Sequence, residues 1–423
     1  MTKGYWFLTL FAAEEIPAAV VTYVALLMLL QLGLTPAEAT LFSALLFVPW
    51  VLKSFMRPWV SRVGHFRLML HLIEALLFVA LVLLALSFKP SSYYSFFNFL
   101  PLRGGGGSLF PFLALLLVSL LAAWHELVAR MYYERMLRPA FQRLFTVPKL
   151  AFSQMAVIIT YGALIVLVGT LEVYFRQIRY SWAMGCYVVA GIFLFFVFHH
   201  LLWLKGSAQL SPREREENVD DCSPFLWRGW SRPLLLLFLL LLPQALMFHA
   251  RVLYLFDTHA HEGLQCTMQE IGFAQGTVGV IAFSLGIALG RVLVNRYSLQ
   301  RLFWPMAFSL VLSPFVYLVM TVWPPQSLWH LCCCTMTAQL LFGLGISVCR
   351  LPISMVSGTR YRNTISMLQI PLVAAVMIVP MAVSGWMVQQ LGYHSFFLVN
   401  ALSAPVCLLG IYLLRRREIP PTL

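Results

Sequence analysis

The stretch from Leu68 to Phe88 reads LMLHLIEALLFVALVLLALSF, and its only ionisable side chains are those of His71 and Glu74. A helix needs about 20 consecutive apolar residues to cross the hydrocarbon core of a bilayer. The apolar residues run continuously here instead of alternating with polar ones, which favours a helix over a strand of a membrane barrel. The stretch therefore predicts a membrane-spanning helix.

The whole chain has the same character. It has 423 residues, of which 61% are hydrophobic and 11% are charged, and its mean hydropathy is +0.82. Soluble domains have about 45–50% apolar and about 25% charged residues. This composition excludes a water-soluble fold, a disordered chain and a collagen-like chain, and it indicates a polytopic membrane protein.

Twelve apolar segments are long enough to cross a membrane. Between the sixth and seventh lies Lys205–Ser231, the only long hydrophilic stretch. We therefore expect an all-α integral membrane protein with an N-terminal six-helix half at 1–204, a cytoplasmic linker at 205–231 and a C-terminal six-helix half with a short basic tail at 232–423. The helices are predicted near 5–32, 38–57, 68–88, 109–130, 149–172, 181–204, 232–252, 270–292, 301–322, 328–349, 364–388 and 394–414.

The basic residues mark one side of the membrane. With twelve spans, 24 of the 29 Lys and Arg residues fall on the side that carries both termini. The positive-inside rule places that side in the cytoplasm. The formal net charge of +13 is therefore a topology signal, and we expect the lipid bilayer, not nucleic acid, as the partner. The remaining five are Lys89, Arg103, Arg176, Arg179 and Arg251.

Motifs for enzymes, cofactors and disulfides are missing from the sequence. His125-Glu126 begins an H-E-x-x-H pattern, but Ala129 stands where the second zinc ligand is required. Neither a G-x-S-x-G motif nor a P-loop is present. Of the eight cysteines only Cys266 is expected outside the cell, so we expect no disulfide there. The sequence predicts neither an enzyme nor a metal or cofactor site. Gly104–Ser108 reads as a flexible linker of either native or engineered origin.

Acidic residues inside predicted spans are costly to insert and need a reason. We expect Glu126 and one of Glu14 and Glu15 to carry protons. Adjacent helix positions point about 100° apart, so Glu14 and Glu15 do not both face a central cavity, and the spacing leaves open which one does. Glu126 and Arg130 lie four residues apart and can pair on one helix face. Beside His125, such a pair is either a protonation switch or a fixed ion pair.

Other polar residues inside the spans are candidates for contact with a solute. Lys53 either reaches toward the cytoplasmic surface or faces a cavity, and Glu74 is expected to pair with Arg57, Arg62 or Arg67. A polar residue in a span also has an ordinary role in hydrogen bonding between helices. The candidate substrate-binding set is Lys53, Arg130, His125, Tyr161, Gln244, Gln369 and Asn400.

Two six-helix halves joined by a charged linker resemble the major facilitator superfamily. The segment Leu46-Phe-Val-Pro-Trp-Val-Leu-Lys-Ser-Phe-Met-Arg-Pro-Trp-Val-Ser-Arg-Val-Gly64 resembles the AmpG-type muropeptide permease branch, whose members share the pattern P-x-x-L-K-x-x-x-x-P-x-x-D-R. The segments Glu270–Gly279, Gly286–Arg291 and Gly392–Asn400 are similar to parts of its second half. The resemblance implies cytoplasmic gate loops made of Arg57, Pro58, Arg62, Gly64, Gly290, Arg291 and Arg296.

The sequence departs from that branch at two places. Ser61 replaces the aspartate of the loop pattern. In the fourth span the branch has Q-D-x-x-x-D, so Glu126 keeps the first acidic position and Arg130 replaces the second. The resemblance therefore implies proton coupling at Glu126 but does not carry over the muropeptide specificity.

These observations predict a secondary transporter that imports a small polar or anionic solute with protons by alternating access. We expect its site near the midplane between the halves, a monomer, and the inner membrane of a bacterium. A transporter of siderophores or acyl-CoA with the same fold, a uniporter or an exporter, and a non-transporting membrane sensor or scaffold remain alternatives.

Overall fold

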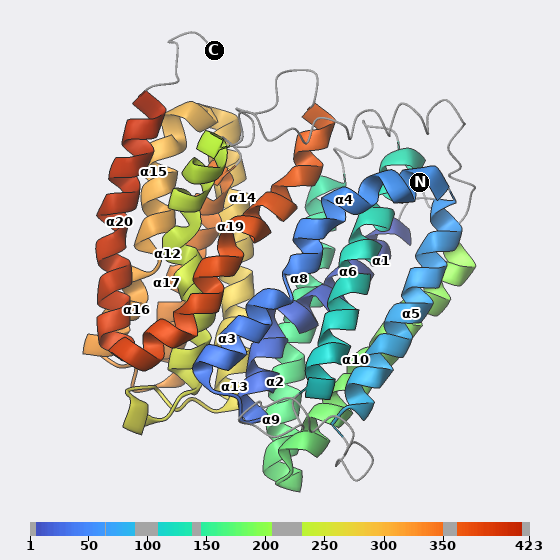
Figure 1. Ribbon diagram of the computed structural model, residues 1–423, viewed down its shortest axis with the longest axis horizontal. Helices are drawn as coiled ribbons and strands as arrows, with labels where there is room; N and C mark the ends of the chain where they lie inside the picture. Colours follow the sequence, from blue (N-terminus) through green and yellow to red (C-terminus); the bar gives the residue numbers. More distant parts are fainter. Residues whose placement is uncertain are drawn as a thin grey trace. The chain divides into compact units, whose positions relative to one another are not determined.

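The computed structural model describes residues 6–63, 65–88, 109–137, 145–204, 231–349 and 362–416 (Figure 1). These ranges contain 12 helices that are long and apolar enough to cross a membrane, so the twelve predicted spans are confirmed. Gly64, the glycine-rich Gly104–Ser108 segment and the charged stretch at 205–230 lie outside the described residues.

The chain packs as two compact units. The first consists of Met1–Thr35 and Leu52–Phe225, and the second of Pro36–Val51 and Leu226–Leu423. The helical elements of the first are α1 (Trp6–Ala19), the π-helical turn η1 (Val20–Val24), α2 (Ala25–Gln31), α4 (Val48–Val63, from Leu52 on), α5 (Phe66–Leu86), α6 (Leu109–Met136), α8 (Thr146–Val157), the π-helical turn η3 (Ile158–Ala163), α9 (Leu164–Phe175) and α10 (Ile178–Trp203).

Over its described residues, the regular elements of the second unit are also all helices. Its elements are α3 (Pro36–Leu45), α12 (Ser231–Phe256), the short η4 (His259–His261), α13 (Met268–Ile271), the π-helical segment η5 (Gly272–Gly279), α14 (Val280–Tyr297), α15 (Leu299–Leu312), α16 (Phe315–Val322), α17 (Leu328–Gly345), η6 (Ile346–Cys349), α19 (Arg362–Leu391) and α20 (Tyr393–Arg416).

The second predicted span is interrupted. A turn at Leu46–Phe47 separates α3 from α4, and Pro49 follows in the first turn of α4, where its missing N–H leaves no helical hydrogen bond unmade. The new helix then continues to Val63. Arg57 and Arg62, which the sequence placed at a loop, therefore lie on a helix.

Small residues bring particular helices of the second unit into close contact. A Cβ atom added at Gly385 of α19 would lie 2.2 Å from the Pro36 carbonyl oxygen of α3, and Thr40 of α3 donates a hydrogen bond to the Ala382 carbonyl at 3.3 Å. A Cβ at Gly286 of α14 would lie 2.5 Å from the Leu340 carbonyl oxygen of α17. The Gly286-x-x-x-Gly290 spacing thus serves close helix packing.

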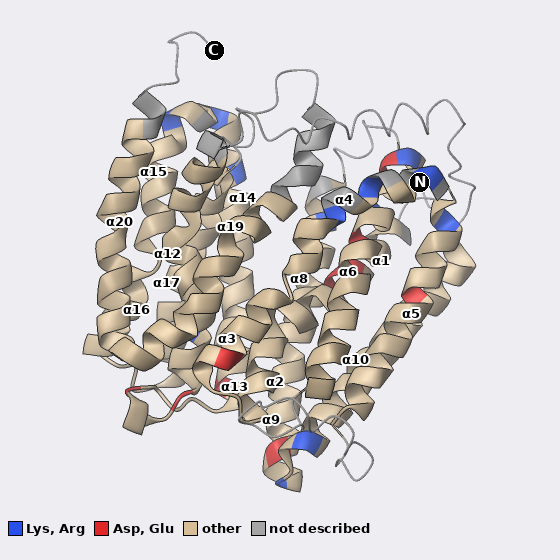
Figure 2. Ribbon diagram, viewed as in Figure 1, with Lys and Arg blue, Asp and Glu red and all other residues tan. Residues whose placement is uncertain are grey.

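Charge follows the pattern expected of membrane helices. In each unit most of the basic positions in view lie toward one end of the helices, and the helix interiors are largely uncharged (Figure 2). Acidic positions inside the length of helices in the first unit are the exception.

Candidate functional site

A buried ion pair joins two helices of the first unit. The Lys53 ammonium on α4 pairs with the Glu126 carboxylate on α6, and 4% and 9% of the two side chains is exposed. Sequence spacing had offered Arg130 as a partner of Glu126 and had left open whether Lys53 faces inward. The structure turns Lys53 inward and places it against Glu126, because a buried ammonium needs an opposite charge.

The two glutamates of α1 lie close to this pair. Both Glu14 and Glu15 interact electrostatically with Glu126 and with Lys149 of α8. Ser153 of α8 also forms a hydrogen bond with the Glu15 carboxylate. We call Glu14, Glu15, Lys53, Glu126 and Lys149 the acid–base cluster. It brings three carboxylates and two ammonium groups from four helices together, so the gain or loss of one proton changes the balance of charge in the whole group.

Lys149 is a member of this cluster that the sequence analysis counted only as a cytoplasmic basic residue. Its ammonium lies 3.7 Å from the ring centroid of Phe11 and 5.4 Å from that of Tyr133. Cation–π contacts of this kind hold a cation where water is scarce. Lys149 lies two residues inside the start of its span. A charged residue inside a span was the signal in the sequence that could have identified Lys149 as a site residue.

Arg130 has a second acidic neighbour on its own helix. The Arg130 guanidinium lies 3.9 Å from the Glu134 carboxylate, at the i, i+4 spacing. Arg130 therefore lies at the end of α6 with an acidic neighbour on the side away from Glu126. Its predicted role in binding a solute stays a prediction.

Glu74 is surrounded by histidines. Its Oε1 lies 2.5 Å from His200 Nδ1 and 3.3 Å from His125 Nε2, and its Oε2 lies 3.7 Å from His71 Nδ1. Thr9 of α1 adds a 3.2 Å contact with His200 Nε2. The expectation that Glu74 pairs with an arginine is wrong, because the packing of α5 against α6 and α10 supplies imidazoles as partners at this depth. We call Glu74, His71, His125 and His200 the histidine cluster.

The histidine cluster changes the interpretation of His125. The sequence indicated that His125 belongs to the substrate-binding set, but its side chain is fully buried against Glu74. His125 and Glu126 are neighbours on α6 and face different partners, as adjacent helix positions must. Among the described residues, no group of three or more His, Cys, Asp or Glu side chains could hold a metal ion.

Tyr161 lies at one of the π-helical turns. Its ring stacks on that of Tyr23 with centroids 5.0 Å apart and an interplanar angle of 18°. Tyr161 belongs to η3 and Tyr23 to η1, so the two irregular turns of the first unit meet at this stack. Single π-helical turns inside α-helices are often found at functional sites.

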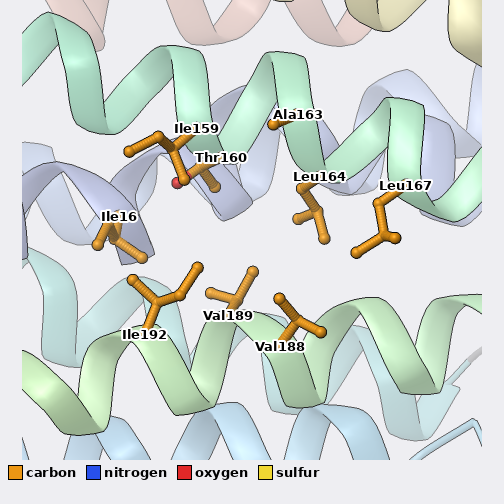
Figure 3. Close-up of a pocket in the computed structure, with 9 residues that line it drawn as sticks. All are labelled: Ile16, Ile159, Thr160, Ala163, Leu164, Leu167, Val188, Val189 and Ile192. Carbon is orange, nitrogen blue, oxygen red and sulfur yellow. The ribbon is translucent and has the colours of Figure 1, made fainter.

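One pocket of the first unit is apolar. It has a volume of about 90 Å³, and Figure 3 shows its lining side chains from α1, η3, α9 and α10. Thr160 contributes the polar side chain of this pocket, and the other lining residues are Ile16, Ile159, Ala163, Leu164, Leu167, Val188, Val189 and Ile192. None of the predicted site residues lines this pocket, which offers a polar solute little to bind.

Two candidates in the second unit act as links between helices. Gln244 of α12 donates a hydrogen bond to the Leu310 carbonyl of α15 at 2.7 Å, and Asn400 of α20 donates to the Pro243 carbonyl of α12 at 3.1 Å. These contacts match the ordinary role of polar residues between membrane helices. The side chains of Gln369 and Pro58 lie outside the described part of the chain.

The predicted gate residues lie on helices where the structure describes them. Arg291 and Arg296 belong to α14, which continues to Tyr297 because no Pro or Gly interrupts it after Gly290. A Cβ at Gly290 would lie 3.0 Å from the Leu344 carbonyl oxygen, so this glycine serves helix packing. Arg296, which was expected in a loop beyond the predicted span at 270–292, lies on the helix, and the role of Arg291 and Arg296 in gating stays a prediction.

The fold is that of major facilitator transporters. The chain is similar to a bacterial homologue of the human lysosomal transporter Spinster (TM-score 0.70, 14% identity, 100% of both chains covered). It is also similar to the nucleoside transporter NupG (TM-score 0.69, 12% identity, 98% of this chain and 99% of that chain) and to a D-xylose-proton symporter (TM-score 0.62, 13% identity, 95% of both). No family model matches the sequence, and no curated protein matches it either.

Proposed function

We propose that the chain is a secondary transporter that moves a small polar or anionic solute across a membrane by alternating access, coupled to protons. The observation that carries this proposal is the Lys53–Glu126 ion pair inside the membrane span, with Glu14 and Glu15 beside it. Ionisable groups buried in membrane helices mark proton or substrate pathways by default.

The coupling follows from the charges of the acid–base cluster. When a proton neutralises Glu126, the attraction that holds the Lys53 ammonium of α4 against α6 is lost. The ammonium then becomes available to an anionic group of the solute. When the solute leaves, Lys53 returns to Glu126 and the proton is released. Glu14 and Glu15 share the field of the same two ammonium groups and therefore act as alternative proton acceptors.

The remaining candidates take supporting roles in this proposal. Arg130 and Tyr161 line the path of the solute in the N-terminal half, 1–204, and Gln369 does so in the C-terminal half, 232–423. The arginines of α4 and α14 control opening toward the cytoplasm, where both termini lie. The distribution of basic residues supports this orientation.

The proposed substrates form a broad class of small polar or anionic solutes. The resemblance to the AmpG-type permeases favours the inner membrane of a bacterium, but the change to Arg130 in the fourth span means that a muropeptide is only one candidate solute; a monomer is the expected working unit. The similar solved structures include a nucleoside transporter and a D-xylose-proton symporter, which supports a small hydrophilic solute moved together with protons.

Uptake into proteoliposomes tests the proposal. Purified protein is reconstituted, and a panel of radiolabelled nucleosides, sugars, peptides and muropeptides is offered with and without an inward proton gradient. At least one solute is expected to accumulate only with the gradient, and Glu126→Gln is expected to abolish that accumulation. The exposed Glu262 gives a matched control, because Glu262→Gln removes the same charge outside the cluster. A complete lack of flux would favour the membrane sensor or scaffold instead.

A further inference from the structure

Arg251 is a buried cation of the second unit that the proposed mechanism leaves unused. It lies on α12 inside the span Leu234–Phe256, and only 7% of the residue is exposed. Its guanidinium carbon lies 5.1 Å from the ring centroid of Phe248. Across the described residues it makes no ion pair, and its Nε–H has no hydrogen-bond acceptor. A cation–π contact offsets only part of the cost of burying such a charge.

Acidic residues close to Arg251 along the chain are engaged elsewhere. Asp257 accepts a hydrogen bond from the Tyr393 hydroxyl at 3.1 Å and lies 3.1 Å from His261 Nδ1. Glu270 completes a capping box with Thr267 at the start of α13. The chain thus leaves a buried guanidinium without a counter-charge in the part that the structure describes.

Polar side chains of three neighbouring spans surround the same level of the unit. The Arg251 guanidinium interacts electrostatically with the Tyr317 hydroxyl. That hydroxyl accepts a hydrogen bond from Gln275 Nε2 at 3.1 Å, and the same amide nitrogen lies 3.4 Å from Thr335 Oγ1. Gln275 Oε1 is buried without a hydrogen-bond donor. The group therefore contains one unused donor and one unused acceptor.

The four polar residues of this group lie at a similar depth in the membrane. Arg251, Gln275, Tyr317 and Thr335 each lie within about seven residues of the end of their own span. Those four ends fall on one side of the membrane, because consecutive spans alternate in direction. At about 1.5 Å of rise per residue, all four lie within about 10 Å of that surface, so the group occupies one level of the second unit.

We propose that Arg251, with Gln275 and Tyr317, binds the oxyanion group of the transported solute, and that the solute also carries a hydrogen-bond donor. A planar guanidinium pairs with carboxylate or phosphate in a fork-like geometry. The free Gln275 carbonyl oxygen then accepts from a hydroxyl or N–H group of the same molecule. This inference rests on the proposed function only in taking the bound anion to be part of the solute.

Thermal unfolding of the purified full chain in detergent tests the site. The probes are gluconate and glucose 6-phosphate, which combine an oxyanion with hydroxyl groups, acetate, which has the oxyanion alone, and glucose, which has hydroxyl groups alone, all at matched ionic strength. Gluconate or glucose 6-phosphate is expected to raise the melting temperature more than acetate or glucose, since a ligand that binds the folded state stabilises it. Whichever of the two acts more strongly separates carboxylate from phosphate.

The Arg251→Gln variant is expected to bind the effective probe on the order of tenfold to a hundredfold more weakly, the range for losing hydrogen bonds to a charged group. The matched control is Arg301→Gln, which removes an exposed arginine of α15 and is expected to bind like the wild type. If Arg251→Gln does not fold, Arg251→Lys keeps the charge without the fork and is expected to fold and to bind more weakly.

Two results would overturn the site. One is that neither gluconate nor glucose 6-phosphate stabilises the wild type more than acetate and glucose do, and the other is that both Arg251 variants respond like the wild type. Binding is measured without transport, so the two proposals fail separately. Lack of uptake with Arg251-dependent anion binding refutes the proposed function alone, and gradient-driven uptake without that binding refutes the anion site alone.

Discussion

Lys53 of α4 and Glu126 of α6 form an ion pair in which both side chains are at least nine-tenths buried. Neither charge has bulk water to stabilise it, so each depends on the other. The loss of one charge should therefore lower the stability of the protein, and the protonation of Glu126 should release Lys53. Different variants test these two effects.

Breaking the pair from one side should destabilise the protein. The Lys53→Met variant leaves a buried carboxylate beside Glu14 and Glu15, and we expect a loss of about 3–5 kcal/mol, the usual range for an orphaned buried charge. The double variant Lys53→Met with Glu126→Leu removes both charges and should recover most of that loss. Unfolding in detergent measures the free energy of unfolding of Lys53→Met, Glu126→Leu and the double variant. If the losses of the two single variants simply add in the double variant, the pairing is contradicted.

The histidine cluster should matter for stability and leave proton coupling intact. The Glu74→Leu variant removes the acceptor that His125 and His200 share, and leaving buried polar groups unpaired costs about 1–3 kcal/mol for each group. Glu74→Gln keeps one acceptor oxygen and should be milder. Melting temperatures measure the loss of stability, and gradient-driven uptake per folded molecule measures whether proton coupling is intact. If the Glu74→Leu variant is as stable as the wild type, the histidine cluster does not stabilise the fold.

The contact between α3 and α19 should not tolerate a methyl group. The Gly385→Ala change places a Cβ atom 2.2 Å from the Pro36 carbonyl oxygen and 2.3 Å from Thr40 Oγ1, and overpacking of this kind costs about 1–3 kcal/mol. Gly191→Ala of α10 is the matched control, because nothing lies within 4 Å of its added Cβ, and alanine favours a helix by up to about 1 kcal/mol. Equal melting temperatures for the two variants would contradict the close contact.

The thiol of Cys266 should be slow to react. Cys266 lies between two spans, where burial and the nearby Glu270 raise the pKa of the thiol to about 12. A raised pKa keeps the thiol neutral, and only the thiolate reacts. Alkylation of Cys266 by a maleimide, followed by mass spectrometry of the peptide that contains Cys266, should therefore accelerate about tenfold for each pH step of one unit from pH 7 to pH 10. A rate that levels off near pH 8.5, as for an ordinary thiol, would show that the site is open to water.

The sequence predicted the spans well because their signal is local. Continuous apolar runs such as Leu68–Phe88 need no knowledge of neighbouring helices, and the residues that the structure describes contain 12 helices of this kind. Local signals failed at breaks and irregular turns. The turn at Leu46–Phe47 and the π-helical segments around Tyr23, Tyr161 and Gln275 depend on packing against other helices, which hydropathy does not describe.

The partners of buried charges could not be predicted for a related reason. Periodicity identifies neighbours on the same helix, and it correctly placed Arg130 one turn from Glu126. The observed partners come from other helices: Lys53 lies 73 positions away from Glu126, and His200 lies 126 positions away from Glu74. The types of the residues in the spans were informative, while their pairing depended on the tertiary arrangement.

Solute counterflow compared with gradient-driven uptake in Glu126→Gln proteoliposomes is the sharpest test of whether Glu126 couples protons to transport. Counterflow exchanges labelled for unlabelled solute and needs no net movement of protons. Glu126→Gln is expected to retain counterflow and to lose accumulation driven by a proton gradient, while Glu262→Gln keeps both. Accumulation in Glu126→Gln at the level of the wild type would contradict the proposal that the Lys53–Glu126 pair couples protons to transport.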